Sequence, residues 1–165
     1  MSDFDPVGTI SFFRERHRVE SLTTGSVLRA LPVGSLSYAP HPGSSTAGAT
    51  AWTIVRCLNV CGRLIHSASA EVSHTGHPDH EALVSSFETE SATLAEKLLA
   101  LQQSDWLEER SVTSGGHLLL KQPIGQILWL FHVDAIHHRG QISTYLRGFG
   151  AKVPSIYGPS GDSQA

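Results

Sequence analysis

The chain has 165 residues, of which 40% are hydrophobic and 16% charged, and its formal net charge is -3 at pH 7. A chain of this size can bury a core without disulfides, and the lack of a basic run argues against nucleic acid as a partner. No apolar stretch is long enough to cross a bilayer, and the N-terminus MSDFDPVG lacks a signal-peptide pattern, so we expect a cytoplasmic protein that does not bind membranes.

The first half of the chain predicts two amphipathic helices. The first spans roughly residues 6–31, and Pro32 and Gly34 end it; residues 35–44 form a loop. The second spans roughly residues 45–68. Side chains at three- and four-residue steps share one inner face in each helix. In the first helix these are Ile10, Phe13, His17, Ser21, Thr24, Leu28 and Leu31, and in the second Thr50, Ile54, Cys57, Leu58, Cys61, Leu64 and Ile65.

The second half predicts two more helices. Asp79 is a suitable N-cap for a helix over residues 80–103, and residues 104–116 read as a polar connection. The fourth helix begins near Pro123 and ends at residues 148–150, where glycine suits a helix stop. Four amphipathic helices and a Pro/Gly-rich tail predict an all-α four-helix bundle, with residues 1–165 as one domain.

The two cysteines are expected to be reduced. Cys57 and Cys61 lie four residues apart in a helical stretch, a spacing poorly suited to a mutual disulfide. This agrees with a cytoplasmic location, where thiols stay reduced.

An acid and a histidine stand out on the fourth helix. Asp134 and His138 are four residues apart, so they project onto the same arc as the apolar positions. A buried charge without a partner costs several kcal/mol. The two side chains are therefore expected to look into the crevice between the helices, either as a metal-binding pair or as a buried carboxylate–imidazolium pair that fixes the packing.

The C-terminal part of the chain resembles a known family. The sequences HHRGQ (residues 137–141), YLR (145–147) and VPSIYG (153–158), together with ALPVGSLSYAPHP and AGATAWTIVR upstream, resemble the DinB-like superfamily, which includes bacillithiol transferase and YfiT-like proteins. The likeness in helix order covers most of the chain and is densest at the C-terminus.

The resemblance implies a four-helix bundle that holds a divalent metal, usually zinc or nickel, through three histidines. Two of these come from the fourth helix, four residues apart, and one from the second helix. His138 matches the histidine of the HRGQ motif. Asp134 stands where the family has the other histidine, and a carboxylate is an acceptable ligand. Thr53 stands at the second-helix position, and a neutral hydroxyl is a poor ligand for zinc.

Other side chains could replace the missing ligand or serve the structure. Cys57 lies one turn beyond Thr53 and could be a thiolate ligand or a small core residue. His17 could be a ligand or a core histidine with a backbone partner. His137 points about 100° away from His138 and should face an edge or solvent. The run His74, His77 and His80 is interpreted as a polar loop rather than a metal site.

Three further polar residues flank the fourth helix. Arg139 and Arg147 could neutralise an anionic substrate such as a thiol cofactor with carboxylates, or they could bond the tail or a neighbouring carboxylate. The HRGQ context favours a structural role for Arg139. Gln141 lies one turn past His138 and could hydrogen-bond a ligand or a backbone carbonyl.

Two classes of function follow. In the first, the protein is a metal-dependent enzyme that uses Asp134 and His138, and by analogy with the family it catalyses thiol S-transfer or hydrolysis on a small molecule. In the second, motivated by Thr53, it is a binding or structural bundle that has lost the metal. The family resemblance also implies a homodimer. DNA binding, which the family name suggests, disagrees with the acidic charge balance.

Overall fold

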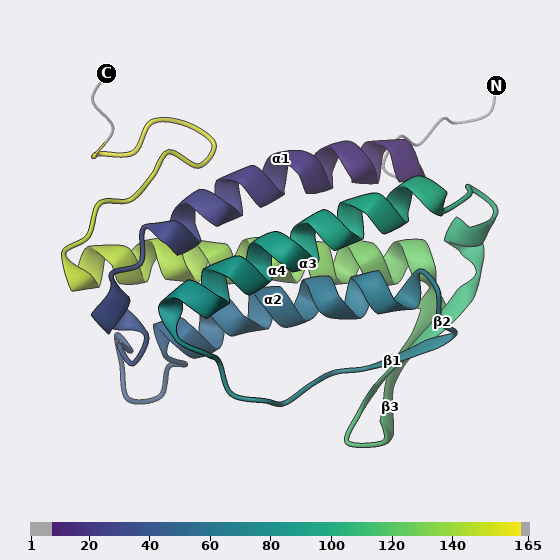
Figure 1. Cartoon of the computed structure of the whole chain (residues 1–165), viewed down its shortest axis with the longest axis horizontal. Coiled ribbons are helices and arrows are strands. Elements are labelled where there is room, and N and C mark those ends of the chain that lie inside the picture. The colour runs from purple at the N-terminus through teal and green to yellow at the C-terminus, as the bar shows by residue number, and fades with distance from the viewer. Residues whose placement is uncertain (1–7, 163–165) are drawn as a thin grey trace.

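The computed structural model describes residues 8–162. Four long helices lie side by side, and a small sheet covers one end of the bundle (Figure 1). The helices are α1 (Ile10–Arg29), α2 (Ala47–Leu64), α3 (His80–Ala100) and α4 (Ile124–Phe149). Along the chain, α1 and α4 run in one direction and α2 and α3 in the other (Figure 1). The predicted four-helix bundle is confirmed; α1 and α2 are shorter at both ends than the periodicity suggested, α3 ends earlier, and α4 has the expected bounds.

The helix ends follow local chemistry. The predicted N-cap Asp79 accepts a hydrogen bond from the Ala82 amide at 2.9 Å, which satisfies one of the free N–H groups of the first turn of α3. Thr9 and Thr46 cap α1 and α2 in the same way. Gly150 ends α4 with φ of 79°, a left-handed conformation that glycine adopts without steric cost.

The chain is mostly helical but not purely so. Residues 104–116, expected as a polar connection, contain the 3-10 helix η3 (Asp105–Leu107) and the strand β2 (Glu109–Ser114). β2 pairs antiparallel with β3 (His117–Pro123) and parallel with the short β1 (Ser69–Glu71). Gly115 and Gly116, both with positive φ, make the turn between β2 and β3. The pairing of β1 with β2 joins segments some forty residues apart, which no local periodicity reveals.

The tail packs back on the helices, as its apolar residues suggested. Val153 and Ile156 are partly buried against the core. Asp162 forms an ion pair with Arg147 of α4, at 2.5 Å between Nη1 and Oδ2, and accepts from the Val153 amide. Within residues 8–162, no helix is long and apolar enough to cross a membrane.

Gly125, in the first turn of α4, lets the helix approach the buried Trp106 of η3. A Cβ at this position would lie 2.3 Å from the Trp106 indole. We therefore expect Gly125→Ala to lower the free energy of unfolding by about 1–3 kcal/mol through overpacking. Urea denaturation followed by circular dichroism measures the effect.

Gly140 provides the matched control in the same helix. A Cβ there would meet nothing within 4 Å, so Gly140→Ala should raise the free energy of unfolding by about 0.5–1 kcal/mol, because alanine favours the helix. Equal effects of the two substitutions would contradict the packing argument.

Candidate functional site

The predicted pair lies in the seam between α2 and α4, joined by a thiol. His138 Nε2 lies 3.5 Å from Asp134 Oδ2, and Cys57 Sγ of α2 donates to the same oxygen, also at 3.5 Å. Spacing of four residues on one helix brings Asp134 and His138 together, and helix packing adds Cys57. The side chains of Asp134 and His138 are 43% and 22% exposed, so the pair lies at the edge of the seam rather than deep within it.

Gln141 determines which nitrogen of His138 faces the carboxylate. Its Oε1 lies 2.8 Å from His138 Nδ1. An amide oxygen only accepts, so Nδ1 carries a hydrogen and Nε2 points toward Asp134. In a neutral imidazole, Nε2 would then present a lone pair to a carboxylate oxygen. Nε2 is thus the ring nitrogen that faces Asp134 and could act as a metal ligand.

The thiol of Cys57 is protonated in this arrangement. Burial, followed by the nearby Cys61 and Asp134, raises the pKa of the Cys57 thiol well above its ordinary value. It therefore acts as a hydrogen-bond donor to Asp134. Both cysteines are free, in agreement with the expected reduced state.

Thr53 of α2, the position at which the sequence resemblance implies a third ligand, makes internal contacts. The Thr53 hydroxyl donates to the Ala49 carbonyl at 3.0 Å and accepts from Arg56 Nη2 at 2.8 Å. His17, the other replacement considered, is 2% exposed, and its Nε2 contacts the Ser91 carbonyl at 3.0 Å. It is a core histidine with a backbone partner. Among residues 8–162, no three or more His, Cys, Asp and Glu side chains form a group that could hold a metal ion as they stand.

The remaining histidines of the sequence patterns have separate partners. His74 contacts the Ser114 hydroxyl, His77 the Pro78 carbonyl and His80 the Leu28 carbonyl. Residues 72–79 have no regular structure, as the loop interpretation predicted. His137 is exposed, also as expected.

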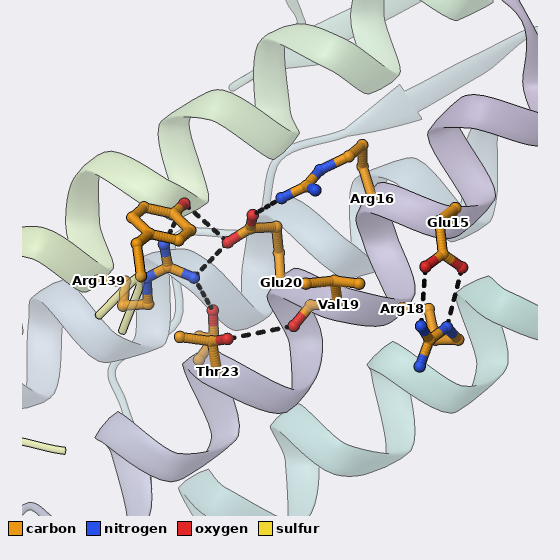
Figure 2. A network of polar contacts seen from close by, with 9 residues as sticks. Glu15, Arg16, Arg18, Val19, Glu20, Thr23 and Arg139 are labelled. Atoms are coloured by element: carbon orange, nitrogen blue, oxygen red, sulfur yellow. Dashed lines mark hydrogen bonds and ion pairs between the residues drawn. The ribbon is translucent and has the colours of Figure 1, made fainter. Parts of the chain in front are cut away.

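A second polar centre joins α1 to α4; the sequence indicated a structural role for Arg139 but did not identify Glu20 as its partner. Arg139, 1% exposed, donates from Nη1 to Glu20 Oε2 at 2.6 Å, and Arg16 also contacts Glu20. Tyr157 of the tail accepts from Arg139 Nη2 at 2.6 Å and donates to Glu20 at 2.9 Å. Figure 2 shows Arg139 reaching Glu20 while Arg16 approaches from the same helix as Glu20. The structural role expected for Arg139 is confirmed, and Arg147 likewise holds the tail.

The two charges stabilise each other inside the bundle. Burial alone would raise the pKa of Glu20, but hydrogen bonds from Arg139, Tyr157 and Arg16 outweigh it and hold the pKa below its ordinary value. Glu20 is therefore ionised at neutral pH. The arrangement satisfies both charges of the buried pair, and nothing in it leaves Arg139 available to a substrate.

His132 is a further buried polar residue that the apolar pattern did not indicate. It is 8% exposed, and its Nε2 is buried with no hydrogen-bond partner among the described residues. Burial, with a smaller contribution from His17, lowers the pKa of His132 to about 4. The imidazole is therefore neutral at pH 7. A helical wheel centred on Leu128, Ala135 and Ile142, all buried, would have placed His132 and Arg139 on the inner face.

Comparison with known proteins finds a family model, a relative in sequence and solved structures that resemble this chain over most of its length. The model of the DinB family matches residues 4–164. The chain is 26% identical over 160 residues to the uncharacterized protein YrdA of Bacillus subtilis (strain 168), covering 95% of this chain and 93% of that protein. A crystal structure of a DinB-like protein from Bacillus cereus ATCC 10987 superposes with a TM-score of 0.76 at 24% identity, over 90% of this chain and 98% of the other. The crystal structure of YjoA, a DinB-like protein from Bacillus subtilis, superposes with a TM-score of 0.70 at 18% identity, over 89% of this chain and 99% of the other. The two solved structures support the fold.

Proposed function

Because the chain belongs to the DinB family, we propose that it is a divalent-metal-dependent enzyme of the thiol S-transferase or hydrolase type. Asp134 and His138 are the proposed ligands, and zinc or nickel is the proposed metal. The substrate class is a small molecule, with a low-molecular-weight thiol as the favoured example. The proposal rests on the family resemblance for the reaction type.

The main observation in support of the proposal is that a thiol and an imidazole both approach a single carboxylate oxygen. Cys57 Sγ and His138 Nε2 each lie 3.5 Å from Asp134 Oδ2. Thiolate, imidazole and carboxylate are the ligand types that zinc uses in proteins. The donor set therefore suits a divalent metal, with Cys57 as the third ligand after it loses its proton. The three side chains now contact one another, so they must separate slightly to surround an ion.

The surroundings suit this role. Gln141 holds the Nδ1 hydrogen of His138, which orients the ring and leaves Nε2 for coordination. The exposed part of Asp134 gives a small substrate access from solvent. A bound metal would supply Lewis-acid chemistry and lower the pKa of a coordinated water or thiol.

Metal analysis of untagged protein tests the proposal. We expect stoichiometric metal in the natural protein and loss of that metal in Asp134→Asn and His138→Gln. Gln141→Leu should weaken metal binding by about 10- to 100-fold, since it removes the partner that orients His138. Mass spectrometry of the metal content and competition with a chromophoric chelator measure both effects.

His137→Gln is the matched control, because His137 is an exposed neighbour on the same helix. It should leave the metal content unchanged. Two results together would rule out the proposal. The first is a substoichiometric metal content that is equal in the natural protein and in all four variants. The second is removal of this metal by a chelator without a lower melting temperature.

A second candidate, a binding or structural bundle without a metal, is favoured by Thr53. Its hydroxyl is engaged with Ala49 and Arg56 rather than with the pair on α4. Thr53→His separates the two candidates. Metal binding that appears only in this variant would assign the natural protein to the second class.

A further inference from the structure

Arg56 of α2 lies beside the proposed metal site. Its Nη2 donates to the Thr53 hydroxyl at 2.8 Å. The helices α2 and α4 run antiparallel (Figure 1), and they meet where Cys57 contacts Asp134. One turn from that contact, Thr53 of α2 and His138 of α4 therefore lie at the same level of the bundle. The guanidinium of Arg56 is thus held at the His138 end of the pair.

The positive charge of Arg56 acts on the groups of this site. Burial is the main cause of the raised pKa of the Cys57 thiol, and the charge of Arg56 opposes the rise. A nearby guanidinium favours negative charge on its neighbours. The same charge would favour an anionic group of a bound molecule at this edge of the seam.

The guanidinium of Arg56 keeps donor capacity at its outer end. Nη1 donates to the Ser73 carbonyl at 3.1 Å, in a contact that is exposed to solvent. Each terminal nitrogen carries two hydrogens, and each has one partner among the described residues, so one N–H group on each nitrogen remains for a ligand.

The contacts of Arg56 are also uncharged. Within residues 8–162, no carboxylate forms an ion pair with it. A planar guanidinium matches a carboxylate through two parallel hydrogen bonds. The side chain therefore suits a carboxylate that comes from outside the chain.

The two arginines that the sequence offered for an anionic substrate are engaged elsewhere. Arg139 pairs with Glu20 inside the bundle, and Arg147 pairs with Asp162 of the tail. Arg56 differs from both because it combines a place beside the pair with uncharged partners.

We propose that Arg56 binds a carboxylate of the substrate and holds it beside the Asp134–His138 pair. The carboxylate accepts from Nη1 and Nη2 at the edge of the seam, where Arg56 and Asp134 are both partly exposed. This rests on the proposed function for the reacting end of the substrate, and it narrows the substrate class to small molecules that carry a carboxylate. No bond is made or broken at Arg56, so it is a binding residue.

Two thiols that differ in charge test this on cobalt-loaded protein. 3-Mercaptopropionate carries a carboxylate, and 3-mercaptopropan-1-ol carries a neutral hydroxyl in its place. The thiolate-to-cobalt absorption band measures the binding of each. We expect the natural protein to bind 3-mercaptopropionate about 10-fold more tightly, because only this thiol forms charge-assisted hydrogen bonds with Arg56.

Variants of two arginines on α2 assign the preference. Arg56→Gln should bind both thiols equally, and Arg56→Lys should keep part of the preference, since it retains the charge without the planar fork. Arg63→Gln is the matched control, because Arg63 also donates at 3.1 Å to a backbone carbonyl of the segment that follows α2, that of Glu71. It should keep the full preference. Equal binding of the two thiols by the natural protein, or equal loss of preference in Arg56→Gln and Arg63→Gln, would overturn the proposal.

Metal-free protein separates this proposal from the proposed function. The guanidinium N–H signals of Arg56 are identified in a ¹H–¹⁵N correlation spectrum by their loss in Arg56→Gln. They should shift saturably with 3-mercaptopropionate and not with 3-mercaptopropan-1-ol. If the protein takes up no cobalt but this shift persists, the metal-dependent function fails and the carboxylate site stands. If cobalt binds but both the shift and the thiol preference are absent, only the carboxylate site fails.

Discussion

Arg139→Met is expected to lower the free energy of unfolding by up to about 3–5 kcal/mol, the usual cost of removing one partner of a buried ion pair. Glu20 is 3% exposed and would keep only Arg16 and Tyr157 as partners. For a chain of this size, about 1 kcal/mol corresponds to a shift of roughly 2–4 °C in melting temperature. Urea denaturation and scanning calorimetry measure the loss.

An exposed ion pair on α1, the helix that carries Glu20, gives the control. The side chains of Arg18 and Glu15 are 63% and 57% exposed, and their nitrogen–oxygen distance is 2.8 Å. Arg18→Met should change the free energy of unfolding by less than about 1 kcal/mol. Combining Arg139→Met with Glu20→Leu should recover much of the stability, because no unpaired charge remains buried. If Arg139→Met and Arg18→Met had equal effects, the buried pair would not be a main link between α1 and α4.

The free energy of unfolding should fall by about 3 kcal/mol as the pH is lowered from about 6.5 to 4. In this range His132 takes up a proton in the unfolded chain but stays neutral in the folded protein, so acid favours the unfolded chain. Burial, helped by His17, lowers the pKa of His132 from 6.5 to about 4 in the folded protein. Between these values the unfolded state binds more protons, so the stabilisation is complete above pH 6.5 and is lost toward pH 4. The lowered pKa of His17 acts in the same direction.

Urea midpoints across this pH range, measured with a chelator present, check the expectation. His132→Phe should flatten the pH dependence, whereas substitution of the exposed His137 by phenylalanine should leave it unchanged. An NMR titration that gives His132 a pKa at or above 6.5 would contradict the argument.

Local features of the sequence were sufficient to predict the helices. Periodic apolar residues located α1 to α4, and the N-cap Asp79 and the stop at Gly150 follow from hydrogen bonding and backbone sterics within one turn. The contact between Asp134 and His138 is equally local, since side chains four residues apart on a helix are neighbours. The C-terminal motifs were enough to indicate the family.

A helical wheel could place His132 and Arg139 on the inner face of α4, but only the tertiary structure decided which partners meet the polar groups inside the bundle. Glu20, His132 and Arg139 are buried, while Asp134 lies at the edge, although all four are hydrophilic. The position of a side chain on its helix does not show whether a charge can be buried, because that depends on whether a partner from a distant segment meets it. The approach of Cys57 to Asp134 and the pairing of β1 with β2 have the same origin. Sequence periodicity reports the contacts within a helix, and the contacts between elements exist only once the elements have packed.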